Sequence, residues 1–597
     1  MCGIIGVAGK IPSEQKFLRA RDVLSHRGPD GAGSYFVPGE CIALGHRRLS
    51  IIDLSRAGVQ PMHSRDGRYI LTFNGEIYNY LELREELKSC YSFITRTDTE
   101  VLLAAYVTWG ADCLSRLNGM YAFAVWDRKE RVLFAVRDRL GIKPFFYHHA
   151  SDGTFSFSSE IKGLRSLGVS SSPNEAIIYE YLSCGFYDHS ERTFFNNIKQ
   201  LPAGYSLCWK EGRVQIKKYW DLADIEPQKF RSELDIRNKF TELLADSVRL
   251  QFRSDVPVGI SLSSGMDSNG LLYFAEHQIV PAPQMVSVCP QSDSYNECTL
   301  IDASLSAAQH ARWHTRNIEP AELFTRIEKM TAIEDQPYGG IPTLSWLMLY
   351  EQAREKGITV LLEGEGLDEI LAGYPYYELD LAHDAQGIPF STDVFQDSRA
   401  FLDRDVLSTE FVSAFADRRL NFPHPFVSAL QNAQYRDIKY TKLPRVLRFK
   451  DHASMSVGRE LRVPYLDHRL VEFCFFLPAQ YKIRNGIHKM IARDVLGVYL
   501  PDIVRVRPKK IFGALQVEWL RNHYREEVLA LLGSESFRNR GFWNYDKLLA
   551  KVNAFYCGEG DNSFFLWQCV NLELWFRMYV DLNTSKLPSE DKVLRVG

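Results

Sequence analysis

The segment Val256–Ser268, with the sequence VPVGISLSSGMDS, decides the fold expected for the larger part of the chain. It begins with a nearly continuous apolar run, Val256–Leu262, whose length and composition are typical of a buried strand. A Ser/Gly loop follows, then a helical stretch over Asn269–Gln278 and a second strand candidate at Met285–Val288. Strand, loop, helix and strand in this order indicate a βαβ unit of a parallel sheet.

The sequence on both sides extends this pattern. Leu234–Phe252 and Ala303–Ala311 have helical spacing, and Thr359–Leu362 is a strand candidate that runs into a Gly-rich loop. After residue 378 the sequence is mostly helical and closes with the aromatic and leucine-rich segment Phe564–Val580. We therefore expect an α/β parallel-sheet domain with a helical C-terminal part over residues 232–597.

The first 205 residues have a different texture, because short β-like runs alternate there with turn residues. Tyr80–Lys88 and Thr99–Trp109 have helical spacing, and the polar segment Asp221–Arg231 indicates a linker, placed at 206–231. The mixture predicts a layered α+β domain over residues 1–205. The strand candidates are Ile42–Leu44, Tyr69–Phe73, Ala122–Trp126, Val132–Arg137, Phe145–His148 and Phe155–Ser158.

The composition is that of a multidomain globular protein, with 597 residues, 45% hydrophobic and 24% charged. A net charge of −3 without a basic run argues against a nucleic-acid partner. No apolar stretch reaches the roughly 18 residues of a membrane-spanning helix. No secretory signal is recognisable, and the eleven cysteines show no metal spacing, so we expect reduced, buried thiols and a cytoplasmic location.

Cys2 is the most informative single residue, because removal of Met1 would place a thiol and a free α-amine on one Cα. Their unperturbed pKa values are about 8.5 and about 8, so the amine can take the thiol proton directly or through one water. A nucleophile and its base would then come from one residue.

Several segments after Cys2 carry polar residues in a fixed order. Together they resemble the class II glutamine amidotransferase domain, which implies an N-terminal-nucleophile hydrolase fold, an αββα sandwich. The segments are Gly45–Asp53, Phe73–Asn79, Arg96–Glu100, Leu117–Phe123 and Arg137–Gly141.

The resemblance implies a role for each matched residue in glutamine hydrolysis. The Asn74 side chain and the Gly75 N–H would stabilise the oxyanion, and Arg48 would bind the glutamine α-carboxylate. Asp98 and Glu76 would accept from the α-ammonium group, and Ile52 completes the expected glutamine site. Singly, these residues have structural interpretations, since Asn-Gly favours a turn and Asp98 could cap a helix.

The loop after Val256–Leu262 lacks the lysine and the spacing of a Walker P-loop. It resembles instead the pyrophosphate-binding loop of enzymes that cleave ATP to AMP and pyrophosphate. Further matches extend the resemblance over the whole chain, to the glutamine-hydrolysing asparagine synthetase family. They are Glu363–Tyr374, Leu443–Asp451, Arg459–His468 and the basic turn Arg507–Lys510.

The resemblance also implies the residues of an ATP site. Asp267 and Asp368 would hold Mg²⁺ on the pyrophosphate, because carboxylate oxygens suit that ion. Glu365 would manage the proton when ammonia attacks the acyl-adenylate, and Lys489 would stabilise charge on the phosphates. The remaining ATP-binding residues expected are Leu262, Ser263, Gly265, Ser268, Val288, Glu363 and Gly364.

Two positions depart from the family pattern. Ser264 replaces a glycine, which costs about 1–2 kcal/mol if the site needs a positive φ. Glu363 replaces a serine and could point away from the site, pair with a cation or meet a substrate amine.

Aspartate is the leading acceptor, with another carboxylate, such as a uronic acid or a secondary metabolite, as the alternative. A glutaminase-only or regulatory protein with a decayed ATP site is the further alternative, and a β-lactam-forming enzyme is disfavoured. The oligomeric state stays open, with a homodimer as one possibility.

Overall fold

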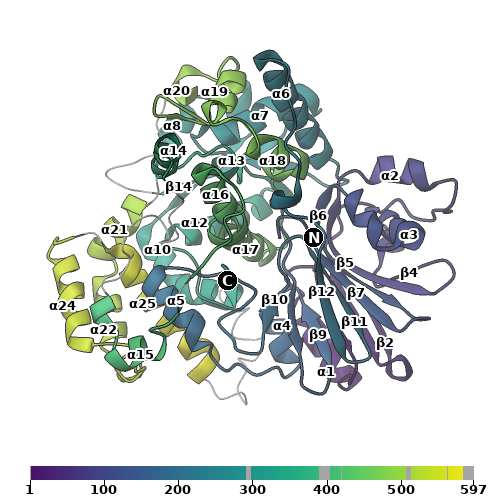
Figure 1. The fold of residues 1–597 in the computed structure, drawn as a ribbon, viewed down its shortest axis with the longest axis horizontal. Helices are drawn as coiled ribbons and strands as arrows, with labels where there is room; N and C mark the ends of the chain where they lie inside the picture. Colours follow the sequence, from purple (N-terminus) through teal and green to yellow (C-terminus); the bar gives the residue numbers. More distant parts are fainter. Residues whose placement is uncertain are drawn as a thin grey trace.

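The computed structural model describes residues 2–290, 297–388, 404–418, 420–505, 513–560 and 562–581. The predicted basic turn Arg507–Lys510 lies outside these residues. Figure 1 shows two antiparallel sheets on the right, the parallel-sheet part in the centre and at the top, and C-terminal helices on the left.

The N-terminal part is an αββα sandwich of two six-stranded sheets. Side chains alternate along the first strand: Ile4 and Ala8 pack between the sheets, while Ile5 and Val7 pack towards α1. The first sheet runs β10 (Lys199–Gln200), β8 (Phe146–His149), β9 (Phe155–Ser158), β1 (Cys2–Ala8), β3 (Ile42–Arg48), β2 (Gly31–Val37). The second runs β12 (Arg213–Lys218), β11 (Tyr205–Lys210), β7 (Val132–Arg137), β6 (Gly119–Asp127), β5 (Tyr69–Ile77), β4 (Met62–His63).

Helices cover the outer face of each sheet and confirm the predicted fold class. On the first sheet lie α1 (Glu14–Asp22) and α4 (Ile161–Ser166), and on the second α2 (Tyr80–Leu87) and α3 (Asp98–Trp109). The helix α5 (Glu175–Cys184) packs instead into the core of the C-terminal helices.

The central part contains a five-stranded sheet in which every pair of neighbouring strands is parallel. Its order is β15 (Trp313–Ile318), β14 (Gln284–Pro290), β13 (Val258–Ser261), β16 (Val360–Leu362), β17 (Glu460–Arg462). Because the chain leaves β13 towards β14 and later returns to β16 on the other side, the order reverses at β13. The carboxyl edge at such a reversal is the usual ligand site of an open α/β sheet.

The helices of this part surround the sheet and extend beyond it, and two short strands, β18 (Ile483–Arg484) and β19 (Ile487–His488), form a small hairpin. The helices include α6 (Glu233–Gln251), α7 (Met266–Gln278), α8 (Glu297–Asp302), α9 (Ala307–His310), α10 (Pro320–Thr325), α11 (Ile327–Glu334), α12 (Pro342–Glu355), α13 (Leu367–Ile370), α17 (Leu443–Met455), α18 (His468–Phe475), α19 (Met490–Leu496) and α20 (Asp502–Arg505). The others are α14 (Tyr377–Gln386), α15 (Thr409–Ala414), α16 (Ala429–Arg436), α21 (Gly513–Asn522), α22 (Arg525–Leu532), α23 (Glu535–Arg538), α24 (Tyr545–Tyr556) and α25 (Ser563–Phe576).

Two sequence predictions need correction. The linker expected at 206–231 is wrong in its first half, because β12 is an edge strand of the second sheet and β11 lies between β12 and β7. Lys210 and Arg213 pair at the turn between these two strands. The expectation that all cysteines are reduced is also wrong, since Cys289 and Cys298 form a disulfide.

Buried polar contacts join the two parts. Arg27 pairs with Asp451 at 2.8 Å, Asn118 Nδ2 donates to Asp467 Oδ2 at 2.9 Å, and Trp220 Nε1 donates to Glu472 at 2.8 Å. None of the helices in the described ranges combines the length and apolar character needed to cross a bilayer.

Candidate active sites

Cys2 opens the strand β1 and is 7% exposed. Its backbone nitrogen donates to Asn74 Oδ1 at 3.0 Å, and Arg27 Nε donates to its carbonyl oxygen at 3.1 Å. Its Sγ lies 4.0 Å from the Leu49 carbonyl oxygen. Burial raises the pKa of the Cys2 thiol, so a neighbouring base has to form the thiolate.

Asn74 and Gly75 lie on β5, a strand of the second sheet that contacts β1 in the first. The Asn74 Oδ1 atom accepts from Cys2, while its Nδ2 is buried without a hydrogen-bond partner among the described residues. A buried, unpaired donor next to a nucleophile fits an oxyanion that forms during the reaction. Gly75 has a φ of +154°, and a Cβ there would lie 2.1 Å from the Met120 carbonyl oxygen, so only glycine fits.

A pocket opens beside Cys2 and is lined by the predicted glutamine-binding residues except Asn74. Arg48 is oriented by backbone carbonyls, with Nη1 donating to Ser55 O at 2.7 Å and Nη2 to Asp53 O at 2.5 Å. These bonds leave further guanidinium N–H groups for an anion. The pocket is lined by Cys2, Arg48, Leu49, Ile51, Ile52, Gln60, Phe73, Gly75, Glu76, Thr97, Asp98 and Thr99.

Asp98 does not cap its helix, because the Thr97 hydroxyl does so by accepting from Glu100 N. One Asp98 oxygen accepts from Ile77 N at 3.0 Å. Burial, with a contribution from Glu460, raises the pKa of Asp98 to about 6. Burial together with Asp98 raises the pKa of Glu76 as well, and Arg462 lies 3.7 Å from that carboxylate. The acidic end of the pocket therefore favours a cation.

The phosphate-loop candidate lies between β13 and α7, at the carboxyl edge of the parallel sheet. The Ser268 hydroxyl accepts from Ser263 N at 3.0 Å and donates to Ser263 O at 3.0 Å, so the loop is closed by its own side chains. Gly265 is the exposed N-cap of α7, and no side chain caps that helix. Uncapped N–H groups at a helix N-terminus favour an anion.

Asp267 and Asp368 lie in the first turns of α7 and α13, the helices that follow the neighbouring strands β13 and β16. Lys489 Nζ lies between them, 2.6 Å from Asp267 Oδ2 and 2.7 Å from Asp368 Oδ1. Burial opposes the charge of Lys489, but the two aspartates outweigh burial and raise its pKa. The segments that follow these two strands are in close contact, because a Cβ on Gly364 would lie 3.0 Å from Asp267 Cβ. The structure thus brings together three of the charged groups predicted for the ATP site.

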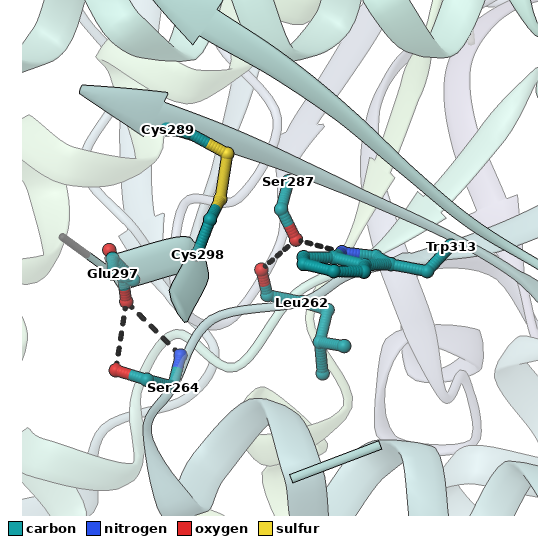
Figure 2. Close-up of a disulfide and its surroundings, with 7 residues drawn as sticks. All are labelled: Leu262, Ser264, Ser287, Cys289, Glu297, Cys298 and Trp313. Atoms are coloured by element: carbon teal, nitrogen blue, oxygen red, sulfur yellow. Dashed lines mark hydrogen bonds between the residues drawn. A yellow bond between two sulfur atoms is a disulfide. The ribbon is translucent and has the colours of Figure 1, made fainter. Parts of the chain in front are cut away.

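Lys489 itself has a φ of +57°, which is uncommon for a residue with a Cβ. Such backbone conformations are frequent at functional sites, where the surrounding structure maintains them. Leu262 and Val288 belong to the expected ATP-binding residues: Leu262 directly follows β13, and Val288 lies on β14. Leu262 O accepts from the Ser287 hydroxyl at 2.6 Å (Figure 2).

Ser264 is not strained, since its φ is not in the left-handed region. Its N–H and hydroxyl both donate to Glu297 Oε1, at 3.1 and 3.2 Å. Glu297 precedes Cys298, and the disulfide from Cys298 to Cys289 ties the start of α8 to the end of β14 (Figure 2). The serine that replaces glycine therefore anchors the loop to α8.

Glu363, the second departure from the family pattern, is 2% exposed. Tyr350 donates to its Oε1 at 2.9 Å, and Lys450 forms an ion pair with its Oε2. Of the three possibilities left open by the sequence, the structure supports pairing with a cation. Sequence reasoning did not single out Lys450, although it lies within the quoted segment Leu443–Asp451.

Two further residues of these sites were missed. Arg27, 0% exposed, contacts Cys2 O and pairs with Glu160 and Asp451. Gln60 lines the pocket beside Cys2 and accepts from Phe73 N at 2.7 Å. The polar run around Arg27, His26–Asp30, was the available signal for the first, whereas Gln60 stands in a loop without a recognisable pattern.

The N-terminal-nucleophile sandwich and the carboxyl-edge site of the parallel sheet define the class, a glutamine amidotransferase joined to an ATP-dependent synthetase. Residues 1–220 match the model of the glutamine amidotransferase domain, and residues 239–577 match that of asparagine synthase. The chain therefore belongs to the asparagine synthase family and is a glutamine-hydrolysing ligase with ATP as co-substrate.

Curated relatives resemble the chain over most of its length. Asparagine synthetase (glutamine-hydrolysing) 1 of Bacillus subtilis is 28% identical over 99% of this chain and 99% of its own. Asparagine synthetase (glutamine-hydrolysing) 3 of the same organism is 30% identical over 85% of this chain and 86% of its own. The amidase chry2 of Gibberella zeae is 28% identical over 87% of this chain and 88% of its own.

Proposed function

We propose that this enzyme converts aspartate to asparagine, with nitrogen from glutamine hydrolysed at Cys2 and with activation of the acceptor as an acyl-adenylate. The observation that carries the proposal is the pair of contacts that Lys489 makes with Asp267 and Asp368. These three charged side chains are largely buried and in contact, as expected for a working ATP site and not for a decayed one. Cleavage of ATP to AMP and pyrophosphate leaves an activated carboxyl carbon for ammonia to attack.

In the glutaminase step, the Cys2 thiolate attacks the glutamine amide after the α-amine freed from Met1 takes the thiol proton. Asn74 Nδ2 and the Gly75 N–H stabilise the oxyanion. The Asn74 donor supports this role, because it is buried without a hydrogen-bond partner among the described residues. Arg48 binds the α-carboxylate, and Asp98 with Glu76 binds the α-ammonium group. Glutamine binding thus uses opposite charges at the two ends of one pocket.

In the synthetase step, Asp267 and Asp368 fit Mg²⁺, since Lys489 shows that they bind one cation jointly. Among the described residues no third His, Cys, Asp or Glu joins them, so phosphate and water oxygens would complete the coordination, as is usual for this ion. Bound Mg²⁺ would neutralise charge on the phosphates. Lys489 would shift to the phosphate oxygens, and Ser263, Gly265 and Ser268 would bind the pyrophosphate.

The identity of the acceptor carboxylate is a separate part of the proposal. The relatives named asparagine synthetases support aspartate, and one of them resembles the chain over nearly its full length. The relatives named amidases favour the second candidate, the same chemistry on another carboxylate. A cytoplasmic location and a homodimer stay predictions.

Acceptor-dependent pyrophosphate release tests the proposal. With Mg·ATP and glutamine, we expect aspartate to stimulate release at least about tenfold over the acceptor-free rate, whereas glutamate, one methylene longer, stays near background. Release is followed with a coupled phosphate assay, and the amide is identified by mass. Stimulation by a uronic acid but not by aspartate would replace aspartate with the second candidate, and glutamine hydrolysis without any release would contradict the synthetase assignment.

The charge of Asp98 predicts the pH dependence of glutamine use. An ionised carboxylate is needed for the α-ammonium group, and burial raises the pKa of Asp98 to about 6. Protonation of Asp98 should therefore steepen the fall of kcat/KM for glutamine below this pH by up to about tenfold per unit, in addition to the loss caused by protonation of the Cys2 α-amine. Steady-state glutaminase rates check this, with Asp98→Asn as the comparison. A variant that keeps the wild-type acid limb would contradict the role of Asp98.

A further inference from the structure

Lys450 lies on α17 and is directed at the loop that follows β16. Its ammonium group forms ion pairs with both Glu363 and Glu365. The side chains of Lys450 and Glu363 are 6% and 3% exposed, whereas that of Glu365 is 29% exposed. One buried cation therefore serves two carboxylates, and the Glu365 carboxylate alone is accessible from the site.

The contacts of Glu363 hold Lys450 in place. Tyr350, from α12, donates to Glu363 Oε1 at 2.9 Å, and the Trp346 ring of the same helix lies 4.8 Å from Lys450 Nζ. Burial opposes the charge of Lys450, but Glu363 and Glu365 outweigh burial and raise its pKa. A buried ion pair is costly to form and needs such additional partners. The arrangement thus keeps a charged ammonium at a fixed place beside Glu365.

We propose that Lys450 is a positioning residue for the amidation step, which acts through Glu365, and that Glu363 is the internal counter-charge that fixes it. The inference rests on the proposed function of Glu365. When ammonia attacks, a C–N bond forms, the bond from the acyl carbon to AMP breaks, and one proton leaves the nitrogen for Glu365. Lys450 fixes the position of that carboxylate, and because its charge is shared with Glu363, it neutralises Glu365 only partly.

The test separates adenylation from amide formation. Lys450→Met alone would leave Glu363 buried without a counter-charge, so the variant used is Glu363→Gln/Lys450→Met, in which glutamine can still accept from Tyr350. The full chain is assayed with Mg·ATP, aspartate and ammonium chloride. We expect asparagine formation to slow about 100-fold and ATP–pyrophosphate exchange, which reports adenylation, to slow much less, by at most about tenfold.

Three comparisons exclude a merely structural role. The single variant Lys450→Arg keeps both the positive charge and Glu363, so it should retain most of the amide formation that the double variant loses. Adding Glu365→Gln to the double variant should cost little more, since both changes act on one step. Lys482→Met removes another buried lysine, which donates to Gln434 Oε1 and Phe475 O, and it should lower exchange and amide formation in equal proportion.

The outcomes are distinct. Equal loss of exchange and amide formation in Glu363→Gln/Lys450→Met, or amide formation within about threefold of wild type, would overturn the inference while leaving the proposed function intact. A wild-type enzyme that gives neither exchange nor amide with aspartate would overturn the proposed function, and this inference with it.

Discussion

The variant Cys2→Ala is expected to lose glutamine-dependent amidation by about 1,000-fold or more, because alanine supplies no nucleophile for the amide carbon. Ammonia-dependent amidation should stay within about threefold of wild type, since the charged groups of the ATP site come from other elements. Amide formation is measured with glutamine and with ammonium chloride as alternative donors.

Cys90→Ala serves as the control for this variant, because Cys90 is an exposed thiol on the same part of the chain. It should retain both activities. Equal loss of both activities in Cys2→Ala would show that the two sites are not separable, and retained glutamine use would exclude Cys2 as the nucleophile.

The variant Asp267→Asn is expected to have the opposite effect. Asp267 and Asp368 hold one cation between them, and loss of one charge weakens the binding of both Lys489 and Mg²⁺. We expect amidation to fall by about 100-fold or more with either nitrogen donor, while glutamine hydrolysis stays within about threefold.

Asp246→Asn is the matched control, because Asp246 pairs with Arg249 and Arg469 away from both sites. It should change neither activity by more than about twofold. Unchanged amidation in Asp267→Asn would contradict the metal assignment, and a parallel loss of glutamine hydrolysis would indicate a folding defect.

The fold class was predictable because its signals are local. The apolar run before Ser263 and the helical spacing after it place β13 and α7 without any tertiary information. The strand β1 was harder, since Cys2–Ala8 contains two glycines and its pairing with β3 and β9 is long-range. The linker was misplaced because the edge strand β12 is largely exposed and reads as a polar segment.

The charged residues of the sites were predictable where a motif contained them, as for Asp267, Asp368 and Lys489. Their contacts were not, because they come from segments far apart in the chain. Lys450 and Glu363 are separated by 87 positions, and only the fold shows that one neutralises the other. The disulfide was unpredictable for a similar reason, since the spacing of Cys289 and Cys298 matches no known motif and the geometry of α8 brings them together.

The central claim is that nitrogen released at Cys2 reaches an acceptor carboxylate activated by ATP. The most direct measurement incubates the enzyme with glutamine labelled with ¹⁵N in its amide, unlabelled aspartate and Mg·ATP, and follows products by mass spectrometry and ³¹P NMR. We predict asparagine with one ¹⁵N atom in its amide, together with equal amounts of AMP and pyrophosphate. Labelled ammonia released into solution without asparagine, or ADP and phosphate in place of AMP and pyrophosphate, would contradict the account.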